Sequence, residues 1–269
     1  MPLYSATNPL PVNMERRRLF NPSRIAGLQL WLDATKGLFD ATSGGNPVTT
    51  DGDTVARWED QSGSGYHVTQ ATLANRPVLK TGIRNSKNVV RFDGSNDALV
   101  SANIADNNLS AMTCFVVSYI AGFGGGGFGR YFDRGGGNGR LWFVDARNVG
   151  GSPANCNTVI IGATGGPGHQ TALNSLSSSN WFLSSVRWDG GTSYIANISQ
   201  KINRVVSSRG VDNSFILTSV GNTTYVIGNR TALDRAFNGD FAELIIYNQA
   251  LTTEQIDNVE GYLAAKWGF

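Results

Sequence analysis

Residues 239–268, GDFAELIIYNQALTTEQIDNVEGYLAAKWG, indicate the fold most clearly, because they join a strand pattern to a helix pattern. Residues 241–247 form a short run rich in aliphatic and aromatic side chains, which is typical of a buried strand. Thr252 and Gln255 then have capping-box spacing, and Gly268 follows the end of the expected helix. Between them, apolar residues recur every three or four positions: Ile256, Val259, Leu263 and Trp267. We therefore expect a closing strand followed by a helix that docks on a sheet.

Upstream of this segment, the chain consists of short apolar runs separated by turn residues. Asp-Gly and Asn-Gly steps supply the positive φ that hairpins need. The chain has 33 glycines among 269 residues, more than the average glycine content of about 7% would give. The spacing predicts an all-β fold, a two-sheet antiparallel β-sandwich of the jelly-roll type with one C-terminal helix. The predicted strands lie at 28–33, 89–92, 112–120, 140–144, 181–188, 194–198, 225–228 and 241–247.

The first 27 residues differ from the rest, because four prolines interrupt them and no apolar period survives. We expect two parts, an extended N-terminal arm (1–27) and a sandwich domain (28–269). The guanidinium group of arginine presents several donors that match carboxylates and phosphates, so the arm carries our candidate partner-binding residues. A solvated run of charge remains the alternative for these arginines. The candidates are Arg16, Arg17, Arg18 and Phe20.

Composition excludes several partners. The net charge of +2 is too small for a general nucleic-acid field, and no apolar run approaches the roughly 20 residues that cross a bilayer. We expect no nucleic-acid or membrane partner. The N-terminus lacks the pattern of an export signal. Cys114 lies in an apolar run and Cys156 in a polar loop, so we expect thiols rather than a disulfide.

Residues able to support catalysis are scarce. Both histidines, His67 and His169, lie in stretches that resemble surface loops, without the neighbours of a catalytic triad or a zinc site. Glu254, Asp257 and Glu260 recur at helical spacing, which indicates a solvated helix face rather than a strand site. We therefore expect no enzyme activity.

Two further kinds of site stay open, and neither is assigned. The turns at 51–53 and 93–97 offer clustered oxygens that could bind calcium, but Asp-Gly turns also arise for backbone reasons, so we predict no cofactor. The glycines of 122–129 read as a mobile hairpin tip, because no phosphate-loop signature follows them. Aromatic platforms for a sugar are available in Tyr66, Phe123, Phe128 and Trp142, whereas core positions are expected for Trp31, Trp58, Trp181, Trp188 and Trp267.

Several segments taken together resemble a known family. LQLWLDA (28–34), WEDQSGSG (58–65) and VVRFDGSNDAL (89–99), with the closing strand and helix, are similar to the concanavalin A-like lectin/glucanase superfamily. They resemble above all its laminin-G-like jelly-roll domains, which occur in phage structural proteins and bacterial surface proteins. Enzymes of this superfamily carry a Glu-x-Asp-x-x-Glu strand motif, and nothing in this sequence matches it.

The resemblance and the missing motif together suggest a non-enzymatic structural or binding protein. We expect a phage virion component, either a head decoration (cement) protein or a tail-associated protein, held by its arm to other virion proteins and to copies of itself. The alternative is a glycan-binding adhesin or lectin-like receptor-binding module, on a phage or on a bacterial cell surface. A glycoside hydrolase is a third alternative, and the absent carboxylate motif ranks it last.

Overall fold

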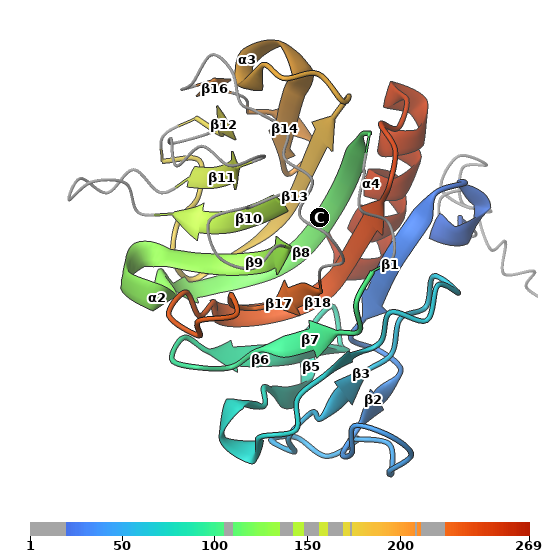
Figure 1. The fold of residues 1–269 in the computed structure, drawn as a ribbon, viewed down its shortest axis with the longest axis vertical. Helices are drawn as coiled ribbons and strands as arrows, with labels where there is room; N and C mark the ends of the chain where they lie inside the picture. The colour runs from blue at the N-terminus through green and yellow to red at the C-terminus, as the bar shows by residue number, and fades with distance from the viewer. Residues whose placement is uncertain are drawn as a thin grey trace, which may run out of the picture.

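The computed structural model describes residues 20–104, 110–134, 142–147, 156–160, 169–172, 174–207, 209–210 and 224–269. These residues form three layers: two antiparallel sheets packed face to face, and helix α4 (Thr253–Trp267) on the outer side of one of them (Figure 1). The expected all-β sandwich with a C-terminal helix is confirmed. No described helix is both long and apolar enough to span a bilayer.

The helix-covered sheet, sheet A, is built around β8 (Met112–Gly122). This strand pairs with β13 (Asn180–Trp188) on one side and with β18 (Asn238–Tyr247) on the other, although the three lie far apart in the sequence. β1 (Leu28–Asp33) also pairs with β18. The order across the described strands is β15 (Val205–Val206), β14 (Ile198–Ile202), β13 (Asn180–Trp188), β8 (Met112–Gly122), β18 (Asn238–Tyr247), β6 (Lys87–Asp93) and β5 (Val78–Arg84).

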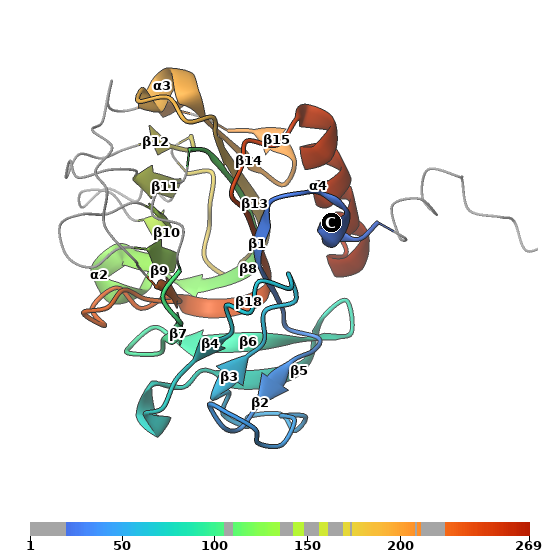
Figure 2. The same ribbon diagram turned by 45° about the vertical axis from the view of Figure 1, so that its right-hand side comes forward.

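The opposite sheet, sheet B, is made mostly of shorter strands. Figure 2 shows β10–β12 of this sheet and α4 on opposite sides of β8 and β13. The order across the described strands is β16 (Arg209–Gly210), β12 (His169–Gln170), β11 (Cys156–Ile160), β10 (Trp142–Arg147), β9 (Phe128–Arg134), β17 (Tyr225–Ile227), β7 (Leu99–Ser101), β4 (Val68–Thr69), β3 (Arg57–Trp58) and β2 (Leu38–Phe39).

Two hydrophobic cores explain why β8 is apolar along both faces. Between the sheets, the ring of Phe241 packs against those of Phe237 and Phe92, with centroids 4.8 and 5.2 Å apart. On the outer side of sheet A, Phe115 belongs to a second core that includes the helix residue Trp267. A strand covered on both faces buries every side chain, so its sequence shows a continuous apolar run instead of an alternation.

Helix α4 begins and ends as its sequence predicts. The Thr252 hydroxyl accepts from the Gln255 amide at 3.2 Å, and the Gln255 side chain accepts from the Thr252 amide at 2.9 Å. Gly268 ends the helix with a φ of +76°, a conformation that glycine adopts at little cost. The predicted apolar stripe is buried against sheet A: Ile256, Val259, Leu263 and Trp267.

Short helical turns account for two errors of the sequence analysis. The predicted strand at 194–198 is instead the one-turn helix α3 (Tyr194–Asn197), because the Ser193 hydroxyl accepts from the Ala196 amide at 3.2 Å. The segment predicted to be a hairpin tip instead contains the turn α2 (Gly124–Gly127) and joins β8 of one sheet to β9 of the other. A Cβ on Gly125 would lie 2.5 Å from the Arg235 backbone, so the turn is closely packed. The 3-10 turns η1 (Pro22–Arg24) and η2 (Leu73–Asn75) complete the described elements.

Candidate functional site

A row of polar residues crosses the outer face of sheet B, on the side away from the core. Direct cross-strand pairs link its five positions, and such partners lie on the same face of a sheet. Val159, the neighbour of Thr158 on β11, belongs to the core between the sheets, so Thr158 faces outward. We call these positions the polar row: Arg130 on β9, Asp145 on β10, Thr158 on β11, Gln170 on β12 and Arg209 on β16.

An irregularity in β9 adds a second carboxylate to this face. The pairing of β9 with β10 shifts by one residue at Tyr131, so that Arg130 and Asp133 both face outward. Their side chains form an ion pair, with Arg130 Nη1 2.6 Å from Asp133 Oδ2. Both side chains are buried, which makes this charge pair part of the floor of the face rather than a solvated surface contact.

Two neighbours in the polar row bury hydrogen-bonding atoms that are not paired with any described residue. Thr158 and Gln170 are 0% and 2% exposed, yet Thr158 Oγ1 and Gln170 Nε2 have no hydrogen-bond partner in the part of the chain that the structure describes. A buried polar atom left in this state costs about 1–3 kcal/mol, so such atoms need an explanation. A hydroxyl group and an amide side by side provide both donors and acceptors, which suits a ligand rich in hydroxyl groups.

Arginines and one aromatic ring lie at the β9 end of this face. Arg230 pairs with Asp234, and this contact, together with the nearby charge of Asp133, raises the pKa of Arg230. The guanidinium of Arg235 lies 4.9 Å from the ring centroid of the half-buried Phe128. The face therefore joins charged groups to an apolar ring, the usual combination in small-ligand sites.

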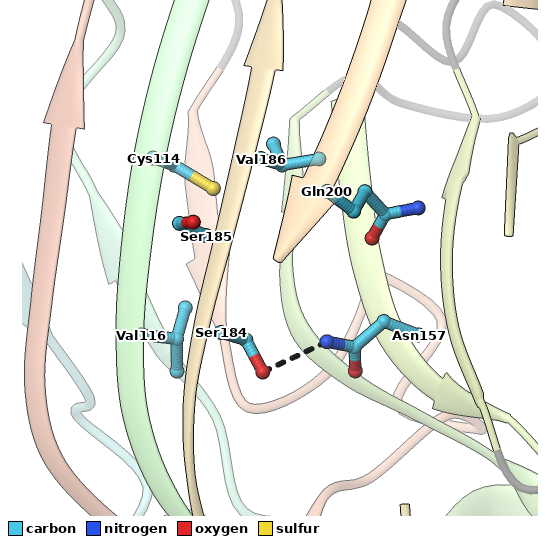
Figure 3. Close-up of a pocket in the computed structure, with 7 residues that line it drawn as sticks. All are labelled: Cys114, Val116, Asn157, Ser184, Ser185, Val186 and Gln200. Atoms are coloured by element: carbon cyan, nitrogen blue, oxygen red, sulfur yellow. Dashed lines mark hydrogen bonds between the residues drawn. The ribbon is translucent and has the colours of Figure 1, made fainter. Parts of the chain in front are cut away.

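A gap between the two sheets, shown in Figure 3, is a weaker candidate. Asn157 Nδ2 donates to Ser184 Oγ at 2.8 Å across the gap, which is too narrow to admit a water molecule. Burial raises the pKa of the Cys114 thiol, so this side chain stays protonated and is a poor nucleophile. The gap is therefore part of the core. It is lined by Cys114, Val116, Asn157, Ser184, Ser185, Val186 and Gln200.

The two histidines lie in different environments. His67 is in an exposed loop, where its Nδ1 accepts from the Asp60 amide at 3.1 Å. The prediction for His169 is wrong, because this residue lies on β12, is 1% exposed and is hydrogen-bonded to Gln200 at 2.9 Å. Burial lowers the pKa of His169 to about 4, so it is neutral near pH 7.

The turns considered for calcium use their carboxylates locally. Asp93 accepts from the amides of Ser95 and Asn96, and Asp97 accepts from the Asp93 amide at 2.9 Å. Burial raises the pKa of Asp97 to about 6. In the part of the chain that the structure describes, no three His, Cys, Asp or Glu side chains are grouped to hold a metal.

The prediction was wrong for one of the three helix carboxylates and for one of the five tryptophans. Glu254 and Asp257 are exposed, but Glu260 is buried and accepts from Ser185 Oγ at 2.7 Å. Four of the five predicted core tryptophans are buried, whereas Trp181 is only partly buried. Tyr66 and Phe123 are partly buried and pack against the core between the sheets. The side chain of Trp142 and the residues Arg16, Arg17 and Arg18 lie outside the described parts.

Phe20, the remaining candidate partner-binding residue, lies against this chain's own helix. Its ring centroid is 6.3 Å from that of Tyr262 on α4. Further along the predicted arm, Pro22 is buried and its carbonyl accepts from the Tyr247 hydroxyl at 2.9 Å. Residues 20–27 thus pack on the sandwich, with Ile25 in the second core.

Comparison with protein-family models finds no match, and neither does comparison with curated protein sequences. Solved structures do match. A Trypanosoma rangeli sialidase has a TM-score of 0.56 at 13% identity, over 90% of this chain and 33% of that one. A GH54 α-L-arabinofuranosidase has a TM-score of 0.53 at 16% identity, over 79% of this chain and 51% of that one. The chain thus spans about a third of the sialidase, and at this identity the likeness concerns the fold.

These matches contradict two predictions made from the sequence. The neighbours are glycoside hydrolases, so the prediction that this chain is a non-enzymatic phage component is wrong. The prediction failed because it rested on the absence of one strand motif, and a carboxylate pair need not lie on a single strand. A β-sandwich is supported, whereas membership of the concanavalin A-like superfamily is not confirmed.

Proposed function

We propose that this chain is a carbohydrate-active β-sandwich that binds a glycan on the polar row of sheet B. The observation that carries the proposal is the adjacent pair of buried, unpartnered atoms, Thr158 Oγ1 and Gln170 Nε2. Sugars present many hydroxyl groups that both donate and accept hydrogen bonds, and the row offers matching groups across neighbouring strands. The likeness of the fold to a sialidase and an arabinofuranosidase supports the same ligand class.

Hydrolysis of the bound glycan is a second candidate function, favoured by the carboxylate of Asp133 on this face and by the likeness of the fold to two glycoside hydrolases. Glycoside hydrolases use a pair of carboxyl groups, one of which acts as base or nucleophile. Asp133, held by the Arg130 guanidinium, would activate the attacking water in this role.

We also propose that the sandwich belongs to the concanavalin A-like superfamily. Two antiparallel sheets packed face to face and a closing strand followed by a docked helix support this assignment. It concerns the fold, and the choice of ligand rests on the polar row.

The test of glycan binding is a screen of the chain on a glycan array, followed by titration of each bound glycan. Thr158→Val keeps the shape and removes the unpartnered oxygen, so we expect at least about tenfold weaker binding and no loss of stability. Ser118→Ala is the matched control, because Ser118 Oγ is also buried without a partner but lies on β8. Equal affinities for all three proteins would overturn the proposal.

Turnover is measured separately on a panel of polysaccharides and aryl glycosides. If the second candidate function holds, Asp133→Asn lowers kcat by at least about a hundredfold while the glycan still binds. Binding without turnover in the unmodified protein would leave recognition as the function and reject hydrolysis.

A further inference from the structure

Helix α4 covers only part of the outer face of sheet A. Beyond the C-terminal end of the helix, four residues form a second row of direct cross-strand pairs. Trp181 pairs with Tyr119, Tyr119 with Asp240, and Asp240 with Arg91. These four residues come from β13, β8, β18 and β6, and we call them the aromatic row. They lie on the face of sheet A opposite to sheet B, so they are separate from the polar row.

The aromatic row combines two rings with a fixed polar pair. The ring centroids of Trp181 and Tyr119 are 5.6 Å apart, and both side chains are partly exposed. Next to them, Arg91 binds Asp240 through two hydrogen bonds of 2.6 and 2.9 Å. The Arg91 side chain is 42% exposed while that of Asp240 is 1% exposed, so a buried carboxylate holds an accessible guanidinium in one orientation.

Arg84 adds a positive charge beside the rings. Its guanidinium carbon lies 5.5 Å from the ring centroid of Trp181 and 4.7 Å from that of Phe269. Its Nε and Nη2 donate to the carbonyls of Trp267 and Gly268, at 2.7 and 2.6 Å. Among the ion pairs of the described residues none includes Arg84, and its Nη1 makes no hydrogen bond there.

We propose that the aromatic row is a second carbohydrate-binding surface, specific for an acidic saccharide. A sugar ring stacks on Trp181 and Tyr119, its hydroxyl groups bond to Arg91, and a carboxylate of the glycan pairs with Arg84. Rings for stacking and a few oriented polar groups are the components of a small-ligand site. Asp51, whose charge acts on Arg91, is paired with Lys80.

A purely structural role explains only part of this arrangement. The contacts of Arg84 with two helix carbonyls stabilise the end of α4, where a positive charge is favourable. That role requires neither the ring of Tyr119 nor the exposed Arg91. A protein partner would need a larger apolar patch than the rings of Trp181, Tyr119 and Phe269 beside an ion pair, because stable interfaces bury about 800 Å² on each side.

The test is an array of acidic glycans and their neutral counterparts, followed by titration of bound glycans and thermal unfolding of every variant. Trp181→Leu keeps an apolar side chain against the second core but removes the flat ring, so we expect at least about tenfold weaker binding in a folded protein. Tyr119→Ala is a second variant, which removes the other ring and leaves Trp181 unchanged. Arg84→Gln should abolish the preference for acidic over neutral glycans, and added salt should weaken the binding of the unmodified protein.

The controls separate this surface from the polar row. Thr158→Val should leave binding of the acidic glycan unchanged, whereas Trp181→Leu should leave binding at the polar row unchanged. Failure of either site is therefore distinguishable from failure of the other. Three outcomes would overturn the proposal: no acidic glycan binds, acidic and neutral counterparts bind equally, or folded Trp181→Leu and Tyr119→Ala variants retain full affinity.

Discussion

At the scale of single residues, burial controls the chemistry of the side chains. His169 lies on β12 and is hydrogen-bonded to Gln200, and desolvation of its ring lowers its pKa from 6.5 to about 4. The unfolded chain takes up a proton near pH 6.5, but the folded chain does so only near pH 4. The contribution of His169 to stability is therefore complete above about pH 6.5 and is lost as the pH falls toward about 4.

This shift predicts a pH dependence that the variant His169→Gln should lose. Between pH 7 and pH 5, the unmodified protein should lose about 2 kcal/mol of unfolding free energy through this histidine. The measurement is urea unfolding of both proteins at the two pH values, taking the difference between them. His67→Gln changes the exposed histidine and should show the dependence of the unmodified protein. Parallel pH profiles for His169→Gln and the unmodified protein would contradict the assignment.

At the scale of elements, a buried carboxylate joins helix α4 to sheet A. Glu243 Oε1 accepts from Trp31 Nε1 at 2.7 Å and from the Tyr262 hydroxyl at 2.9 Å. Glu243 Oε2 accepts from Lys266 Nζ at 2.7 Å and from Trp267 Nε1 at 2.8 Å. Burial raises the pKa of Glu243 despite these donors. The site thus fastens β1, β18 and the last turn of α4 to one another.

Glu243→Gln should destabilise this junction strongly. All four partners of Glu243 are donors, so the NH₂ group of a glutamine would meet donors where the carboxylate accepts. The change also breaks a buried charge pair with Lys266, which costs about 3–5 kcal/mol. Urea unfolding followed by tryptophan fluorescence measures the effect. The matched control is Glu254→Gln in the exposed first turn of the same helix, where we expect a change below about 1 kcal/mol. Similar effects at both positions would refute the role assigned to Glu243.

At the scale of the whole molecule, the three layers protect both cysteines. Cys114 lies on β8 in the core between the sheets, and Cys156 lies on β11. Both are buried, and neither forms a disulfide. As expected from the sequence, they remain thiols, although Cys156 belongs to a strand and not to a loop.

The native protein should therefore resist thiol reagents. We expect neither cysteine to react at an appreciable rate in native buffer, and both to react in step with the loss of secondary structure in urea. Cys114→Ala and Cys156→Ala variants assign the signal to each residue. Rapid labelling of Cys156 in native buffer would show that sheet B opens independently of sheet A, against this prediction.

Local patterns were sufficient to predict much of the fold. Strand 241–247 and the helix after Thr252 were foreseen because their apolar period and caps depend only on neighbouring residues. The same reasoning failed at Tyr194, where one serine hydroxyl favours a helical turn over a strand. It also placed Trp181 in the core, because an apolar pattern does not tell which part of a sheet a helix leaves uncovered.

The fold class, the closing strand and the docked helix could therefore be predicted from the sequence, since they follow from short-range periodicity and turn chemistry. Only the tertiary structure assembled the two candidate sites. The polar row takes one residue from each of five strands between Arg130 and Arg209, and two of these strands are two residues long. The aromatic row likewise joins residues from Arg91 to Asp240. Such sites depend on cross-strand register, which is set by the packing of the whole sandwich and leaves no local pattern.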